Sequence, residues 1–392
     1  MRRTLSWWLF WGAVTTAAYT YVGFPMLLVL RAVLWPQRLR GLPQSTPLSV
    51  SFIIVAHNEA TYICRKLDNA LAVNYPRERI EIIVASDGSD DGMNALVAAY
   101  PSSAVRLLEL PRRGKNPTLN VAVTAASGDI VVFSDADSML HPDSLTHLLA
   151  PFADPAVGGV GGDYHYETAS ASGAGERSYW SFDRLLKRIE SRGGNMISAT
   201  GQLYAIRREL FQPVPSGVTD DFYTSVRVIA AHRRLVFAPQ ALVSGPEASS
   251  EGAEFQRKVR VLTGGFKSVW ESRQLLNPRH YGFYALQLFT HKLLRRLMIG
   301  PIVVAALTAP LLWGRGWLYR GATVGQLAFH SLALAGFLLR GTPAGRTKLL
   351  SLPLFFDMVY IAAVVALVNL LRGKSQDMWV TQRAKPTVKV SL

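Results

Sequence analysis

Cysteine is nearly absent from this sequence of 392 residues, in which Cys64 is the single example. One cysteine cannot form a disulfide within the chain, and its scarcity fits a domain that faces a reducing compartment. Acidic residues are also few, because 27 Asp and Glu stand against 42 Lys and Arg and leave a formal net charge of +15. Internal repeats and low-complexity tracts are lacking too. These absences exclude a disulfide framework and a repeat architecture.

The positive charge could suggest nucleic-acid binding, but its position along the chain favours a membrane. Much of the excess flanks apolar segments: Arg2, Arg3, Arg31, Arg38 and Arg40 near the start, and Lys292, Arg295, Arg296, Arg340, Arg346, Lys348, Arg372 and Lys374 near the end. Basic residues in such places typically border membrane spans and contact anionic headgroups. An aromatic-interleaved basic groove for nucleic acid is not seen. We therefore expect membrane lipids as partners and no nucleic acid.

Long uncharged runs support this interpretation. Residues 4–30 carry no charge and are long enough to cross a bilayer, and the run is too long for a signal peptide. Residues 297–314, 321–339 and 349–371 can also span, and residues 276–296 suit an amphipathic interfacial helix. The expected units are an anchor and linker (1–45), a soluble-type domain (46–275), the interfacial helix (276–296), further spans (297–371) and a basic tail (372–392). The number of spans and the side of the tail stay open, since the basic tail favours the inside.

Between these segments, apolar runs alternate with helical patterns. Residues 49–56, 80–85, 105–109 and 130–134 read as buried strands, and residues 59–73, 91–100 and 117–126 as helices. Such alternation predicts an α/β domain with a mostly parallel, doubly wound sheet.

Polar residues follow each predicted strand. They are Ala56-His57-Asn58-Glu59, Ser86-Asp87-Gly88-Ser89-Asp90-Asp91, Arg112-Arg113-Gly114-Lys115 and Asp135-Ala136-Asp137. Each alone has a plain alternative, such as a helix cap or a solvated turn. Together they predict one crevice outside the carboxyl ends of the strands, where open α/β sheets bind ligands. Two carboxylates at such an edge suit Mg²⁺ or Mn²⁺ completed by phosphate oxygens.

These segments carry a resemblance to a known family. Residues 51–60, 86–91, 114–120 and 134–137 resemble the successive motifs of family 2 glycosyltransferases, in particular the membrane-bound type with the nucleotide-diphospho-sugar transferase (GT-A) fold. The resemblance covers residues from about 49 to 270. It implies an enzyme that takes a nucleotide-sugar donor, usually a UDP-sugar.

The resemblance also implies roles for single residues. Glu59 and Asp87 would contact the donor nucleoside, Lys115 its pyrophosphate, and Asp135 and Asp137 a divalent metal that bridges to the diphosphate. Thr219-Asp220-Asp221 resembles the family's Thr-Glu-Asp motif, so that Asp221 maps onto the general base. Asp220 and Gln202, with Arg207 beyond it, fall in segments that approach the acceptor. Arg257 and Arg260 would hold diphosphate oxygens.

One departure from the pattern bears on the product. Polymer-forming members carry Gln-x-x-Arg-Trp where this chain has Arg257-Lys-Val-Arg260-Val261, and Val261 offers no ring to stack on a sugar. We therefore expect transfer of one sugar, or a short addition, to a lipid, lipid-linked or glycan acceptor. The expected reaction is inverting and metal-dependent, and the expected location is the bacterial inner membrane with the catalytic domain in the cytoplasm. A processive polysaccharide synthase with an export channel and a catalytically silent membrane scaffold are the alternatives. Trp379 in the tail is a further candidate for the site.

Overall fold

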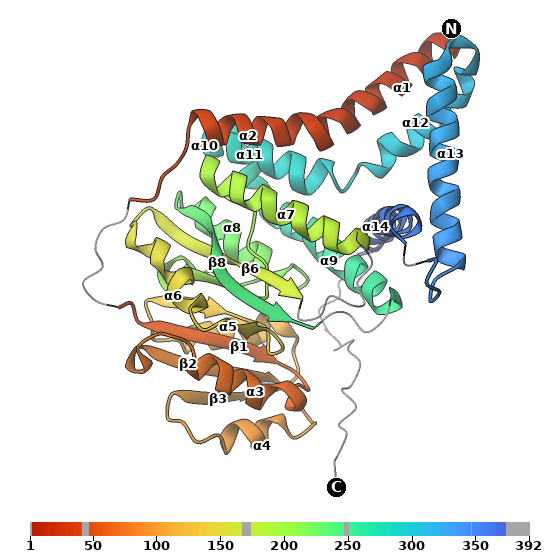
Figure 1. Ribbon diagram of the computed structural model, residues 1–392. Helices are drawn as coiled ribbons and strands as arrows, with labels where there is room; N and C mark the ends of the chain where they lie inside the picture. Colours follow the sequence, from red (N-terminus) through yellow and green to blue (C-terminus); the bar gives the residue numbers. More distant parts are fainter. Residues whose placement is uncertain (1, 41–46, 167–173, 247–250, 346, 374–392) are drawn as a thin grey trace.

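A sheet of eight strands lies at the centre of the folded domain, with helices on both of its faces (Figure 1). The computed structural model describes residues 2–40, 47–166, 174–246, 251–345 and 347–373. The strand order is β3-β2-β1-β4-β7-β6-β8-β5. Its first half consists of β1 (Val50–Ala56), β2 (Ile80–Asp87), β3 (Val105–Leu110) and β4 (Ile130–Phe133), which run parallel to their neighbours. These four strands lie where the sequence pattern predicts them.

The second half makes the sheet mixed instead of mostly parallel. β7 (Tyr204–Arg207) runs antiparallel to both β4 and β6 (Val157–Tyr166). β8 (Arg234–Gly245) pairs parallel with β6, and the short β5 (Met139–Leu140) closes the edge antiparallel to β8. The α/β class is thus confirmed, and the reversal places the segment just before β7 beside the end of β4.

β6 is not predicted from the sequence because glycines replace its apolar side chains. The run Val-Gly-Gly-Val-Gly-Gly begins the strand. A Cβ on Gly158 would lie 2.6 Å from the Arg233 Cβ, and one on Gly162 would lie 2.8 Å from the Ala241 oxygen. The strand therefore needs glycine to approach its neighbours, and this same need removes the apolar pattern by which strands are recognised.

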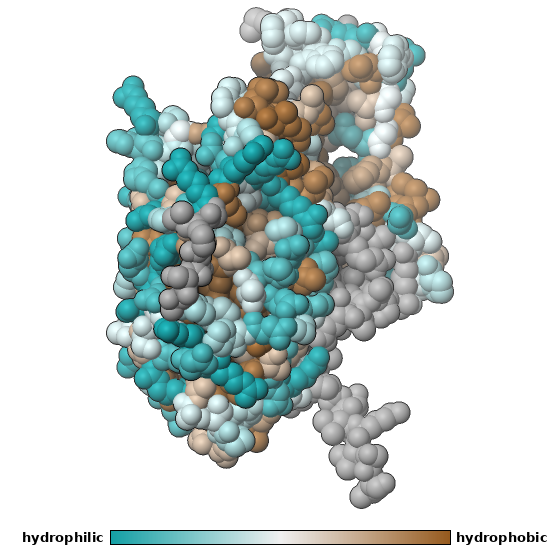
Figure 2. Space-filling model, turned by 60° about the vertical axis from the view of Figure 1, so that its left-hand side comes forward, coloured by the Kyte–Doolittle hydropathy of each residue, from teal (hydrophilic) through white to brown (hydrophobic). Residues whose placement is uncertain are grey.

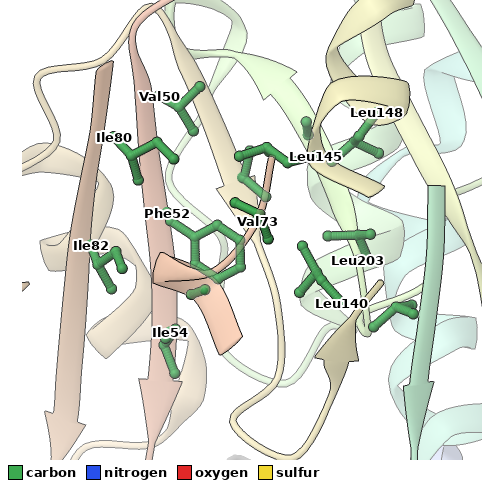
Figure 3. Close-up of a cluster of buried hydrophobic side chains, with 14 of the residues drawn as sticks. Val50, Phe52, Ile54, Val73, Ile80, Ile82, Leu140, Leu145, Leu148 and Leu203 are labelled. Atoms are coloured by element: carbon green, nitrogen blue, oxygen red, sulfur yellow. The ribbon is translucent and has the colours of Figure 1, made fainter. Parts of the chain in front are cut away.

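Two apolar clusters fill the two faces of the sheet. Phe52 and Ile54 of β1 point to one face, towards Leu145 and Leu148 of α6 (Ser144–Leu149), as Figure 3 shows. That cluster also takes residues of α3 (Ala60–Leu71) and α4 (Met93–Ala98). Ile53, on the other face, packs with residues of α5 (Lys115–Thr124) and α8 (Asp220–Ala230). This alternation, with both faces covered, fixes the strand ends that carry the polar residues.

Long apolar helices form the remainder of the described chain. α1 (Arg2–Ala18) continues through a π-helical turn (Tyr19–Gly23) into α2 (Phe24–Leu34). Residues Thr4–Leu34, α13 (Trp317–Leu338) and α14 (Lys348–Leu371) are long and apolar enough to cross a membrane. A fourth candidate span is formed by two consecutive segments, Phe283–Leu294 and α12 (Ile299–Leu311). The two segments are bent by 60° relative to each other. The stretch predicted as one amphipathic helix (276–296) is instead divided into α10 (Pro278–Tyr281), α11 (Phe283–Leu288) and a π-helical turn.

The surface separates into two regions. Figure 2 shows hydrophobic side chains gathered over the long helices, whereas hydrophilic ones dominate the sheet domain. Leu307, Trp317 and Leu338 expose 67%, 83% and 71% of their surface. Apolar exposure on this scale marks an interaction surface. The candidate spans and this surface point to association with a membrane. α7 (Ala174–Gly193) and α9 (Glu251–Glu271) connect the two regions, since both pack against α14.

Candidate active site

The predicted polar residues meet at one edge of the sheet, where β1, β2 and β4 end and β7 begins. Phe133 pairs with Tyr204, so Asp135 after β4 lies near Gln202 before β7. The Ser134 hydroxyl donates to the Gln202 carbonyl oxygen over 2.8 Å and joins the two segments. The antiparallel β7 thus brings residues far apart in the sequence to the ends of the parallel strands.

Lys115 connects two of the predicted acids. Its Nζ lies 3.1 Å from Asp135 Oδ1 and 3.1 Å from Asp220 Oδ2. Burial lowers the pKa of Lys115, but the charges of Asp135 and Asp220 outweigh burial and leave the pKa above its ordinary value. Lys115 therefore stays a cation, placed at the mouth of the site between a β4 carboxylate and an α8 carboxylate.

Asp221 lies beside this pair, in the first turn of α8. Its Oδ1 accepts a hydrogen bond from the Phe222 backbone N–H over 2.7 Å. Burial, and then the neighbouring charge of Asp220, raise the pKa of Asp221 to about 6, although Lys115 and Lys292 act in the opposite direction. A carboxylate with a pKa in this range is suited to take up a proton near neutral pH. The N-cap of α8 is Thr219, so the two acids are not the cap.

Gly201 lies between the acids. A Cβ on this residue would stand 3.7 Å from Asp135 Oδ2 and 3.8 Å from Asp221 Oδ2. Asp135 and Asp221 thus converge on one small space that a glycine leaves open. Beside it, Gln202 Oε1 is buried and has no hydrogen-bond partner among the described residues. A buried acceptor without a partner is costly, and a ligand hydroxyl would satisfy it.

Asp137 lies two residues along the same loop and is 9% exposed. Ser138 Oγ donates to its Oδ1 over 3.3 Å. Within the described ranges, no group of three or more His, Cys, Asp and Glu side chains is arranged to hold a metal. The acid pair can therefore supply only part of a coordination sphere, as in sites that substrate phosphates and water complete.

Lys66 lies beneath this loop, and the sequence reasoning missed it. Its Nζ donates to Ser134 Oγ over 2.8 Å and to the Ser138 carbonyl oxygen. The side chain is fully buried. Burial lowers the pKa of Lys66 to about 7, against the charges of Asp137 and Asp135. The sequence signal that could have revealed it is a lysine on the same helix face as the buried residues Ile63, Leu67 and Ala70.

Asp87 lies at the predicted edge of the sheet, at the end of β2, and other groups of the protein bind its carboxylate. The side chain is 0% exposed and forms an ion pair with Arg112 at 3.1 Å. The backbone N–H groups of Arg113 and Gly114 and the Thr118 hydroxyl also donate to it, over 2.7 to 3.1 Å. The contact of Asp87 with the donor nucleoside stays a prediction, beside these contacts within the chain. Asp87 fixes the loop that leads into Lys115.

The other predicted residues are placed as follows. Glu59 is 2% exposed at the start of α3, directly after β1. Arg257 and Arg260 lie on α9, and their donor contact stays a prediction. Arg207 lies at the other end of β7 and donates to the carbonyl oxygens of Val157 and Phe152, so an acceptor contact is wrong for it. Trp379 lies outside the described residues.

The loop before the acids is held by α5. Asn116 Nδ2 donates to the Pro215 and Val218 carbonyl oxygens over 2.7 and 3.0 Å. Asn120 exchanges two hydrogen bonds with the Val214 backbone, over 2.8 and 3.0 Å. These asparagines belong to the predicted motif around Lys115, yet their amides bind the chain. One helix therefore supplies Lys115 and also positions the segment that ends in Asp220 and Asp221.

Comparisons with known proteins agree with this arrangement. Residues 51–214 match the model of the family described as "Glycosyl transferase family 2". Glycosyltransferase AglE of Haloferax volcanii is 27% identical over 235 residues, which are 58% of this chain and 75% of AglE. Poly-beta-1,6-N-acetyl-D-glucosamine synthase of Staphylococcus epidermidis is 24% identical over 225 residues, 55% of this chain and 54% of that protein. The chain thus matches only about half the length of the synthase.

A solved structure extends the likeness to most of the chain. Mannosyltransferase PcManGT from Pyrobaculum calidifontis, in complex with GDP-Man and Mn²⁺, superposes with a TM-score of 0.71. The match covers 94% of this chain and 100% of that one, at 23% identity. At that identity, the likeness establishes a shared fold. Residues 51–214 therefore carry a family 2 glycosyltransferase domain, and the chain has the GT-A fold.

Proposed function

We propose that this enzyme transfers a sugar from a nucleotide-sugar donor to an acceptor at the membrane, with inversion and with Asp221 as the general base. The observation that carries the proposal is the convergence of Asp135 and Asp221 on Gly201, with Lys115 between Asp135 and Asp220. Lys115 supplies a cation on the proposed donor side, and the proposed acceptor side holds Asp221, a carboxylate with a raised pKa. This polarity suits a leaving diphosphate on one side and a deprotonating group on the other.

Asp221 would act on the acceptor hydroxyl. As the acceptor oxygen forms a bond to the anomeric carbon, its proton passes to an Asp221 oxygen, and the bond from the anomeric carbon to the diphosphate oxygen breaks. The nucleoside diphosphate leaves with the electron pair, next to Lys115. Attack from the face opposite the leaving group inverts the anomeric centre. The Phe222 N–H holds Asp221 Oδ1, so the other carboxylate oxygen is oriented for the proton.

Mg²⁺ or Mn²⁺ is the proposed cofactor, with Asp135 and Asp137 as its protein ligands. Hard carboxylate oxygens are the donors that these ions prefer, and two of them with substrate phosphates form a usual site. A bound ion would neutralise charge on the leaving diphosphate. The presence of Mn²⁺ in the structure of PcManGT supports this choice. Lys115, which contacts Asp135 in the structure described, would turn to the diphosphate.

The donor is proposed to be a UDP-sugar, and a GDP-sugar is the competitor that the PcManGT complex suggests. Glu59 follows β1, Asp87 ends β2, and the loop that Asp87 supports follows β3; a nucleoside is proposed to bind at these strand ends. Arg257 and Arg260 of α9 are proposed to approach the diphosphate.

The acceptor is proposed to be a lipid, a lipid-linked sugar or a glycan presented at the inner membrane, with the sheet domain in the cytoplasm. Gln202 Oε1 offers a hydrogen-bond acceptor beside Asp220. α9, whose Gly264 lies against Thr219, also packs on the candidate span α14. The proposed acceptor side is thus connected to the apolar helices through one helix.

A processive synthase is the alternative that the likeness to the poly-beta-1,6-N-acetyl-D-glucosamine synthase suggests. Val261 is 41% exposed on α9 and offers an apolar patch without a ring. We therefore favour a single or short addition. Products that lengthen with time on one enzyme molecule would establish the synthase instead.

A donor screen tests the proposal. The full chain in detergent is incubated with UDP-, GDP- and other nucleotide sugars, with and without Mn²⁺ or Mg²⁺, and nucleotide release is measured. We expect metal-dependent release from one donor, reduced about 10²- to 10⁴-fold in Asp221→Asn. Asp129→Asn, at the opposite end of the sheet, is the matched control. Release from no donor would favour the silent scaffold.

A further inference from the structure

Lys66 is a buried lysine to which the proposed chemistry assigns no role. We propose that Lys66 is a positioning residue that holds the Asp135–Asp137 loop and thereby sets the affinity of the site for a divalent cation. This inference rests on the proposed metal role of those two acids. It assigns to Lys66 no contact with donor, acceptor or metal, because the side chain is fully buried.

The lysine reaches the loop from the far side of the core. α3 buries Ile63, Leu67 and Ala70, and Lys66 lies on this same face. Its stem crosses the apolar cluster, and its Nζ lies 5.2 Å from the centre of the Phe52 ring. At the end of this path the ammonium meets no solvent. It therefore depends on the loop for its hydrogen bonds.

The two hydrogen bonds of Lys66 enclose the acid pair. One goes to Ser134 Oγ, one residue before Asp135, and the other to the Ser138 carbonyl oxygen, one residue after Asp137. A single ammonium thus ties both ends of a five-residue loop to one point. Such a tie restrains the separation and direction of the two carboxylates, which is the geometry that a divalent ion requires.

Ser134 extends the connection to the acceptor side. Its hydroxyl accepts from Lys66 over 2.8 Å and donates to the Gln202 carbonyl oxygen over 2.8 Å. Lys66, the metal loop and the segment that leads into β7 therefore form one hydrogen-bonded chain. Gly201, which separates Asp135 from Asp221, belongs to that same segment.

Stability alone does not explain a lysine in this place. Burying an ammonium costs free energy, and apolar replacements of buried charges are often neutral or stabilising. Asp137 and Asp135 offset part of this cost, although burial outweighs them and lowers the pKa of Lys66. Groups that orient metal ligands from behind typically change metal affinity 10- to 100-fold when they are removed. A positioning role accounts for both the hydrogen bonds and the cost.

Direct Mn²⁺ binding to the full chain in detergent tests the inference. Free Mn²⁺ is measured by electron paramagnetic resonance during titration, with Mn²⁺ alone and with UDP or GDP added. Wild type is expected to bind, and Asp135→Asn with Asp137→Asn is expected to abolish binding. Lys66→Met should raise the half-saturating Mn²⁺ concentration about tenfold or more. Ser134→Ala, which keeps the ammonium but removes its side-chain acceptor, should raise it by a smaller factor.

Asn69→Ala is the matched control. One turn along α3, Asn69 exchanges two hydrogen bonds of 2.8 Å with the Leu140 backbone, just beyond the loop. Its loss should lower the thermal unfolding midpoint and leave Mn²⁺ binding unchanged. Unchanged or tighter Mn²⁺ binding by Lys66→Met overturns the inference. Unchanged binding would mean that Lys66 does not position the loop, and tighter binding would mean that its positive charge only repels Mn²⁺. If Lys66→Met does not fold, the half-saturating Mn²⁺ concentration of Ser134→Ala decides instead: an increase supports the inference, and no increase overturns it. Failure of wild type to bind Mn²⁺ would instead refute the metal role.

Discussion

At the scale of single residues, the pKa of Asp221 governs the pH dependence of the reaction. Burial and Asp220 raise it to about 6, so that the carboxyl is protonated below that pH and cannot accept a proton from the acceptor. We expect kcat/KM to rise with pH through about pH 6 and to level off above. Asp220→Asn removes a neighbouring like charge and should move this rise to lower pH.

The pH profile is measured with the donor that the screen identifies, at fixed saturating Mn²⁺. Asp129→Asn serves as the control, because Asp129 contacts Ser49 away from the acid cluster. A rise that stays in place in Asp220→Asn would show that another group controls the protonation step.

The same pKa predicts a gain in stability when the base is removed. An unfolded Asp has a pKa of about 3.9, so ionising Asp221 in the folded state costs free energy above pH 6 and none below pH 4. Asp221→Asn should therefore raise the free energy of unfolding at pH 8 by about 1–2 kcal/mol, a value reduced for partial exposure. The gain should disappear near pH 4. Equal gains at both pH values in thermal unfolding would contradict the assignment.

The acids of the candidate site could be predicted individually from the sequence. The residues that hold the loops around them in place could not. Asp135 and Lys115 follow from polar residues at strand ends, Asp220 and Asp221 follow from the resemblance to the family's motif, and the structure brings the four together. Arg112, Gly114 and Thr118 donate hydrogen bonds to the Asp87 carboxylate. These contacts join segments that are distant in the sequence, so no local sequence pattern predicts them. Lys66 was missed for the same reason, because its partners lie about seventy residues further along the chain.

At the scale of elements, β6 shows where pattern reasoning fails. The parallel strands β1 and β4 carry nearly continuous apolar runs and could be predicted, but β6 packs through glycine. Its place in the sheet depends on close approach to β7 and β8 and not on a run of apolar side chains. Without β6, the sequence pattern does not predict that the sheet is mixed.

Substitutions in β6 test this account. On Gly162 a Cβ would meet the Ala241 backbone oxygen at 2.8 Å, which cannot move without the strand. On Gly161 it would meet the Met196 Cε at 2.5 Å, the end of a flexible side chain. Gly162→Ala should lower the free energy of unfolding by about 1–3 kcal/mol, and Gly161→Ala by less than about 1 kcal/mol. Denaturant unfolding in detergent compares them, and equal losses would show that the backbone contact is not decisive.

At the scale of the whole molecule, the apolar helices fix how the enzyme meets the membrane. α13 is one of the candidate spans, with a turn at Trp313–Arg315 before it and residues 339–347 after it. If α13 crosses, Gly314 and Thr342 lie on opposite sides. The single native cysteine makes this testable, because Cys64→Ser leaves a background without thiols.

Gly314→Cys and Thr342→Cys are therefore introduced separately into Cys64→Ser. In intact cells, a membrane-impermeant maleimide should label one of the two and not the other. Thr342→Cys is the one expected to be protected, since Arg340, Arg346 and Lys348 favour the cytoplasmic side. Labelling of both or neither would show that α13 does not span.

The central claim is that the acids around Gly201 form a sugar-transfer site. A structure of the full chain with Mn²⁺ and the nucleoside diphosphate of its donor tests it most directly. We predict density for the ion between the diphosphate and Asp135 with Asp137, Lys115 turned to a phosphate oxygen, and Asp221 facing the open side. A nucleotide bound away from this edge, or an ion that contacts neither Asp135 nor Asp137, would contradict the account.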